Sequence, residues 1–145
     1  MQLNSLYPVL ATDDVAGTAE FYRIHFGFET SFEADWYVSL RLGAWELAIL
    51  QAGHATIPGD RPAATASGIL LNVEVDDVDA VHDRLVAAGL TAALPLRSEE
   101  FGQRHAVFVA PDGVLLDIIT PIAPSGAFAE QFSEEALREA RDGAA

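Results

Sequence analysis

The sequence predicts an α+β fold made of two half-repeats, each with the order strand, helix and three strands. The tripeptide Asp-Asp-Val at 13–15 returns at 76–78, which is 63 residues later. Gly27 and Gly89, 62 residues apart, follow the helical stretches that these tripeptides open. Each βαβββ module would expose an apolar sheet face. We therefore expect the two modules to pair around a central cavity within a single domain over 1–145.

The first module extends over about residues 5–52. Asp14 is suited to cap a helix over 15–25, whose apolar positions follow a 3-4 spacing. Gly27 stands where a helix C-terminus favours positive φ. Strands are expected at 6–11, 28–34, 36–42 and 45–51, with Gly43-Ala44 as a tight hairpin connection.

The second module, about residues 68–121, follows a linker over 53–67 that is rich in small residues, proline and glycine. The pattern predicts a helix at 78–88 and strands at 69–75, 92–97, 104–110 and 114–120. Pro111-Asp112-Gly113 is typical of a turn between the last two strands. The tail over 125–145 is expected to form an acidic amphipathic helix.

Composition narrows the classes of partner. The chain has 8 basic and 22 acidic residues, for a formal charge of −14, which disfavours nucleic acid and anionic membrane surfaces. No run of about 18 apolar residues indicates a membrane span, and the first ten residues do not resemble a signal peptide. Without cysteine there are no disulfides or thiolate ligands. We expect a cytoplasmic protein.

Three stretches resemble the vicinal oxygen chelate superfamily, the glyoxalase/bleomycin resistance protein/dioxygenase group. The first is VLATDDVAGTAEFYRIHFGFE, which resembles the opening signature of strand, aspartate and Phe-Tyr helix. The second half adds VEVDDVDAVHDRLVAAG and FGQRHAVFVAPDGVLLDIITP. The resemblance covers nearly all of residues 6–121. It implies paired βαβββ modules that enclose a ligand pocket.

The resemblance also implies where a metal would be held. Metal-using members place His, Gln or Glu on the first and last strands of the modules. The corresponding positions here are Tyr7, Leu70, Leu47 and Asp117, with Glu46 next to Leu47 and expected to face the other side of its strand. Fewer than three protein donors rarely hold a divalent metal, so we expect a pocket without metal or other cofactor.

Two residues are candidates for chemistry. Asp117 lies in an apolar strand and needs a partner. It could orient a ligand or act as a base, or it could make a structural contact with Arg104 or Arg41. His105 could exchange protons near neutral pH, although a lone histidine is more often a packed residue. The other histidines are expected on the surface: His25, His54 and His82.

Aromatic side chains favour planar or cationic ligands through stacking and cation–π contact, although they can equally fill a core or a dimer interface. The predicted ligand-binding residues are Tyr7, Trp36, Arg41, Trp45, Phe101, Arg104 and Asp117.

The expected function is binding or sequestration of a small drug or metabolite by a homodimer, because the bleomycin-resistance branch works in this way. Three alternatives stay open. One is a metal-dependent lyase, isomerase or dioxygenase of the glyoxalase type. Another is a metal-independent enzyme with Asp117 or His105 as general base. The last is an interaction module that docks a partner through its acidic C-terminal helix.

Overall fold

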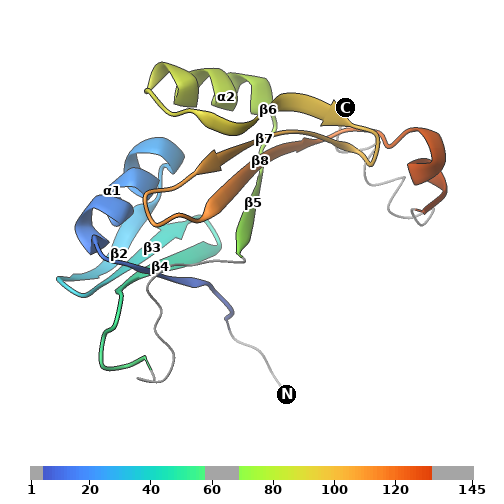
Figure 1. Cartoon of the computed structure of the whole chain (residues 1–145). Coiled ribbons are helices and arrows are strands. Elements are labelled where there is room, and N and C mark those ends of the chain that lie inside the picture. Colours follow the sequence, from blue (N-terminus) through green and yellow to red (C-terminus); the bar gives the residue numbers. More distant parts are fainter. Residues whose placement is uncertain (1–4, 58–68, 132–145) are drawn as a thin grey trace. The chain divides into compact units, whose positions relative to one another are not determined.

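The structure is a computed structural model that describes residues 5–57 and 69–131 (Figure 1). It confirms the α+β class and the two successive βαβββ sets. The first set is β1 (Val9–Thr12), α1 (Val15–Phe26), β2 (Glu29–Ala34), β3 (Tyr37–Leu42) and β4 (Trp45–Gln51). The second is β5 (Leu70–Glu74), α2 (Val78–Ala87), β6 (Ala92–Glu99), β7 (Gln103–Val109) and β8 (Leu115–Pro121), followed by the 3-10 helix η1 (Gly126–Gln131).

The two sheets repeat one topology, with the strand orders β1-β4-β3-β2 and β5-β8-β7-β6. In each sheet the first and last strands of the set are parallel and the other neighbours are antiparallel. The chain divides into two compact units. One runs to Ile69 and includes the turn Ala110–Val114, and the other contains Leu70–Val109 and the residues from Leu115 onward.

The repeated sequence motif marks the helix ends. The Asp14 carboxylate accepts a hydrogen bond from the backbone N–H of Gly17 at 2.9 Å, and Asp77 accepts one from Ala80 at 3.0 Å. These bonds satisfy N–H groups that the first helical turn leaves without partners. Gly27 ends α1 with φ of 74°, a conformation that costs glycine little.

In the first unit, α1 lies across one face of its sheet and contacts β3 and β4 (Figure 1). The cross-strand partners Leu40 and Leu47 are 0% and 4% exposed, and Val38 and Ile49 are equally buried. They share the core with residues on the inner side of α1: Val15, Ala19 and Tyr22.

In the second unit, α2 covers one face of its sheet in the same way. Val78 and Leu85 of α2 are buried, as are Phe108, Leu116 and Ile118 of β7 and β8. The predicted surface residue His82 is only partly exposed, because its ring packs at 5.9 Å from that of Phe108.

Some boundaries differ from the prediction. β1 begins at Val9 rather than at Leu6, which is 87% exposed. β6 continues to Glu99, beyond the expected end at Arg97, because Glu99 pairs with Gln103 of β7. Most of the expected linker and the tail beyond Gln131 lie outside the described residues. Within 5–57 and 69–131, no helix is long and apolar enough to cross a membrane.

A buried polar contact involves the turn Ala110–Val114, which belongs to the first unit. Asp112 is 7% exposed, and its Oδ1 accepts a hydrogen bond from the Val114 N–H at 3.0 Å. Its Oδ2 and the Tyr22 hydroxyl are both buried, and neither has a hydrogen-bond partner among the described residues. Burial, and then the charge of Asp112, raise the pKa of Tyr22. Burial also raises the pKa of Asp112.

We expect Asp112→Asn to stabilise the protein at neutral pH by about 1 kcal/mol, because it removes a buried negative charge and keeps the acceptor for Val114. The folded-state pKa of Asp112 lies above its unfolded value. The destabilisation by its charge is therefore absent below about pH 4 and develops as pH rises through the folded-state pKa.

Urea unfolding of wild type and Asp112→Asn at about pH 7.5 and about pH 3.5 measures this difference in the free energy of unfolding. The exposed Asp13→Asn is the matched control. A variant that is less stable than wild type at the higher pH would contradict the interpretation.

Candidate functional site

The candidate site lies on the face of the second sheet that is opposite α2, here called its helix-free face. Asp117 of β8 pairs with Asn72 of β5 on one side and with Val107 of β7 on the other. His105 pairs with Ile119, so His105 and Asp117 share this face because side chains alternate along each strand.

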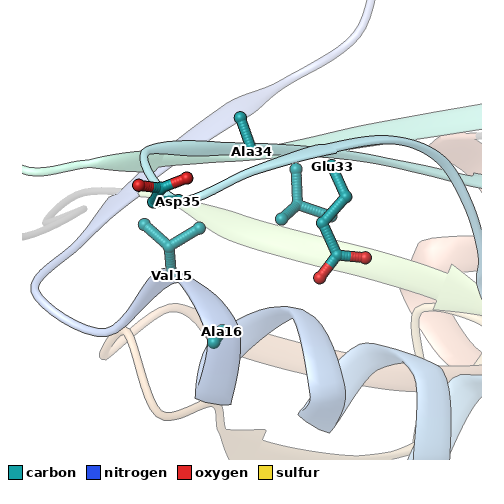
Figure 2. Close-up of a pocket in the computed structure, with 6 residues that line it drawn as sticks. Val15, Ala16, Glu33, Ala34 and Asp35 are labelled. Carbon is teal, nitrogen blue, oxygen red and sulfur yellow. The ribbon is translucent and has the colours of Figure 1, made fainter.

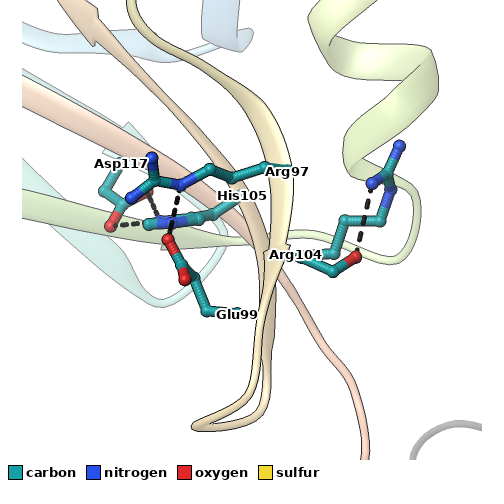
Figure 3. A network of polar contacts seen from close by, with 6 residues as sticks. Arg97, Glu99, Arg104, His105 and Asp117 are labelled. Atoms are coloured by element: carbon teal, nitrogen blue, oxygen red, sulfur yellow. Dashed lines mark hydrogen bonds and ion pairs between the residues drawn. The ribbon is translucent and has the colours of Figure 1, made fainter.

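The centre of the site is a histidine–aspartate pair. His105 Nδ1 lies 2.9 Å from Asp117 Oδ1 and 3.1 Å from Oδ2 (Figure 3). The two residues are 7% and 5% exposed. The partner that Asp117 requires is therefore His105, and neither Arg104 nor Arg41. A carboxylate at Nδ1 orients the imidazole ring and selects a proton at this nitrogen, which leaves Nε2 for other contacts.

Two residues of β6 complete the arrangement. Glu99 Oε1 lies 3.5 Å from His105 Nε2 and also accepts a hydrogen bond from Arg97 Nε (Figure 3). The bond from Arg97 holds the pKa of Glu99 below its ordinary value, so Glu99 is ionised. Arg97, Glu99, His105 and Asp117 together form the His105 cluster.

Phe101 stands at the edge of this cluster. Its ring lies edge-on to the His105 imidazole, with centroids 6.2 Å apart, and it also makes a T-shaped contact with Phe128 of η1, with centroids 6.1 Å apart. Phe101 is 38% exposed. Of the residues predicted to bind ligand, Phe101 and Asp117 are thus brought together with His105.

Arg104 is held elsewhere. Its Nε donates to Asp79 Oδ2 at 2.6 Å and its Nη2 donates to Asp79 Oδ1, so the guanidinium grips the carboxylate with two bonds. Asp79 belongs to α2, which places Arg104 on the helix-covered side of β7, opposite to His105. This pairing lowers the pKa of Asp79 and raises that of Arg104.

In the first unit, the prediction for the last strand was wrong about which side Glu46 faces. The two-residue connection Gly43-Ala44 pairs Leu40 with Leu47 and Arg41 with Glu46. Leu40 and Leu47 are buried under α1, so Glu46 points to the helix-free face of the first sheet. Leu47, which was expected at the ligand position, is therefore part of the hydrophobic core, and the neighbouring Glu46 presents its carboxylate oxygens on the helix-free face.

Glu46 has polar neighbours on this face. Ser39 Oγ donates to Glu46 Oε1 at 3.5 Å, and Arg41 Nη2 lies 3.9 Å from Oε2. Burial and the adjacent Tyr7 hydroxyl raise the pKa of Tyr37. Tyr7 and Arg41, both predicted to bind ligand, thus lie in one polar group with Glu46. The group also contains Tyr37 and Ser39, which were not among the predicted ligand-binding residues.

The two tryptophans differ in their contacts. Trp36 occupies the turn between β2 and β3, where its ring lies 5.6 Å from that of Tyr37 and stacks on His54 with centroids 4.2 Å apart and an angle of 7°. Trp45 begins β4 and is 75% exposed. The structure also has a hollow of about 320 Å³ near the start of α1, lined by none of the predicted residues (Figure 2). Its lining residues are Val15, Ala16, Glu33, Ala34, Asp35 and Val38.

The donor set does not fit the metal that relatives use. Tyr7 lies just before β1 rather than within it, and Leu70, which begins β5, offers no donor atom. Both oxygens of Asp117 contact His105. Within either unit taken by itself, the described residues of 5–57 and 69–131 bring no three His, Asp or Glu side chains together as metal ligands would.

Sequence reasoning missed the contribution of β6. The predicted strand ends at Arg97, so Glu99 falls outside it, and neither residue is among the predicted site residues. The spacing of Arg97 and Glu99 is a usable signal, because positions two apart on a strand share a face. It indicates a shared face with His105 only when β6 is known to continue to Glu99 and to pair Arg97 with His105.

Comparison with known proteins places this geometry in a family. The model of the Glyoxalase/Bleomycin resistance protein/Dioxygenase superfamily matches residues 5–118. No curated protein matches significantly. Solved structures with the same fold include a lactoylglutathione lyase from Agrobacterium tumefaciens, 17% identical with a TM-score of 0.66 over 83% of this chain and 96% of that one.

Two others are a glyoxalase/bleomycin resistance protein/dioxygenase from Nocardioides and TioX from Micromonospora sp. ML1. The first is 20% identical, with a TM-score of 0.72 over 88% of this chain and 89% of that one. The second is 20% identical, with a TM-score of 0.67 over 81% and 98%. Identities this low establish the shared fold and no shared activity. From the family match and the fold together, the chain belongs to the Glyoxalase/Bleomycin resistance protein/Dioxygenase superfamily.

Proposed function

We propose that this protein binds a small molecule on its helix-free sheet faces without the help of a metal ion. The observation that carries the proposal is the buried contact of His105 with both oxygens of Asp117. Asp117 stands where relatives place a metal ligand, and here its lone pairs are directed at a histidine. A carboxylate committed in this way is a poor metal ligand, and it fixes the His105 ring so that its Nε2 side can bind a polar ligand group.

The surroundings favour a planar ligand. Phe101 presents a partly exposed ring beside His105, and Tyr7 and Tyr37 bring phenols to the other helix-free face. Aromatic walls bind flat molecules by stacking and cations through their π faces. The net charge of −14 is compatible with a cationic group on the ligand. The words bleomycin resistance protein in the family name suggest drug sequestration as one such role, which we propose for a cytoplasmic homodimer.

The first prediction from this proposal concerns metal content. Protein purified without chelator is expected to carry far less than one equivalent of transition metal, because Leu70 supplies no donor and Asp117 is engaged by His105. Elemental analysis by mass spectrometry measures this. A stoichiometric amount of nickel, zinc, iron or manganese would move the assignment to the metal-dependent branch.

The second prediction concerns the ligand. In a thermal-shift screen of planar aromatic molecules and cationic antibiotics, at least one compound is expected to raise the Tm. Asp117→Asn should weaken its binding about tenfold or more, because the charged acceptor that orients the His105 ring is lost. The exposed Asp76→Asn is the matched control and should bind as wild type does. Absence of any shift across the screen would count against the proposal.

The same pair favours a second candidate function, proton transfer without a metal. A histidine whose Nδ1 is held by a buried carboxylate is oriented to use Nε2 as a base. It would take a proton from a carbon next to a carbonyl group. Electrons of that C–H bond would form the enolate, and His105 would later return a proton to the same carbon.

Deuterium exchange at carbon tests this candidate, with hydroxyacetone and acetophenone as probes in D2O. Wild type is expected to exceed the buffer rate. His105→Gln should abolish the excess, and Asp117→Asn should lower it by about 10² or more. His82→Gln, on the helix-covered side, should leave it unchanged. Equal rates for wild type and His105→Gln would exclude His105 as the base.

A further inference from the structure

We propose that Arg97 and His105 form a subsite for a carboxylate group of the ligand, and that the side chain of Glu99 occupies this subsite while the ligand is absent. The proposal rests on the proposed binding function and names the chemical group that the helix-free face of the second sheet receives: a planar monocarboxylate, in preference to a cation.

The geometry points to one position for an anionic oxygen. Glu99 Oε1 contacts both Arg97 Nε and His105 Nε2 (Figure 3). Arg97 of β6 and His105 of β7 are direct cross-strand partners, so two paired strands keep the two donors together. A guanidinium and an imidazole that converge on one oxygen are the donors that proteins use to bind carboxylates.

Glu99 is the replaceable member of the cluster. Its distance to His105 is 3.5 Å, beyond that of a normal hydrogen bond, whereas the His105–Asp117 bond is 2.9 Å. Its side chain is 23% exposed, against 8% and 7% for those of His105 and Asp117. It ends β6 beside a turn that contains Gly102 at φ of 105°. The Glu99 side chain can therefore move into solvent while the Asp117 carboxylate stays buried and bonded to His105.

The charges of the cluster determine what replaces Glu99. Glu99 supplies the carboxylate that the Arg97 guanidinium contacts among the described residues. With Glu99 moved away, the positive charge of Arg97 has lost this partner, and the Nε2 side of His105 is open. One monovalent anion at this position replaces the charge that Glu99 supplied. A carboxylate there would place an attached ring beside Phe101, which lies edge-on to His105.

Benzoate is the probe, because it combines one carboxylate with a ring. It is titrated at constant ionic strength into wild type, Glu99→Ala and the matched control Glu100→Ala, whose side chain is exposed and lies one residue further on. The readouts are Tm and the NMR signals of the His105 ring. Glu99→Ala should bind benzoate about tenfold tighter than wild type, because the internal competitor is gone. Glu100→Ala should behave as wild type.

A second substitution locates the binding. Arg97→Gln in the Glu99→Ala background should lose the gain, and the neutral analogue benzamide should show no gain in Glu99→Ala. If the alanine variant does not fold, Glu99→Gln, which keeps the shape and removes the charge, should also tighten benzoate. Equal benzoate affinity in wild type and the folded Glu99 variant overturns the proposal. An equal gain in Glu100→Ala, or binding that survives Arg97→Gln, overturns it as well.

The outcomes separate this inference from the proposed function. If benzamide or a cationic compound binds near Phe101 while benzoate gains nothing from Glu99→Ala, the binding function stands and the carboxylate subsite fails. If no compound, benzoate included, shifts the Tm of wild type or of Glu99→Ala, the proposed binding function itself fails.

Discussion

The structure depends on the fact that each helix covers only one face of its sheet. α1 and α2 bury alternate residues of the strands beneath them, and this burial supplies the core of each unit. The intervening residues point to the opposite face, where their side chains do not pack under a helix and can be polar. The polar groups of both candidate faces, from Glu46 to Asp117, stand opposite the helices because of this alternation.

Burial of ionisable groups explains the composition of the second helix-free face. Asp117, at 5% exposure, would be costly as an isolated charge between apolar neighbours. The chain supplies an imidazole at 2.9 Å as its partner, and the other nitrogen of that imidazole faces a second carboxylate, which accepts a hydrogen bond from Arg97. The result is a cluster in which each carboxylate has a nitrogen donor beside it.

The arginines on this sheet show how strongly register controls role. Arg104 and His105 are neighbours in sequence, yet Arg104 grips Asp79 of α2 on the covered side while His105 meets Asp117 on the other. Arg97, which lies earlier in the chain on β6, is aligned with His105 by strand pairing and so shares its face. Neighbouring polar residues on one strand thus lie on opposite faces of the sheet, because side chains alternate along the strand. Residues far apart in the sequence share a face when strand pairing aligns them.

The sequence by itself determined the two βαβββ sets, the helix caps Asp14 and Asp77, and the turn at 111–113, because these depend on local periodicity, capping and turn chemistry. It also singled out Asp117 and His105 as the polar residues in need of explanation. Only the tertiary structure decided that they contact each other, that β6 reaches Glu99, and that Glu46 rather than Leu47 faces away from α1. These outcomes follow from the register of strands far apart in the chain, where a shift of one residue reverses every side chain.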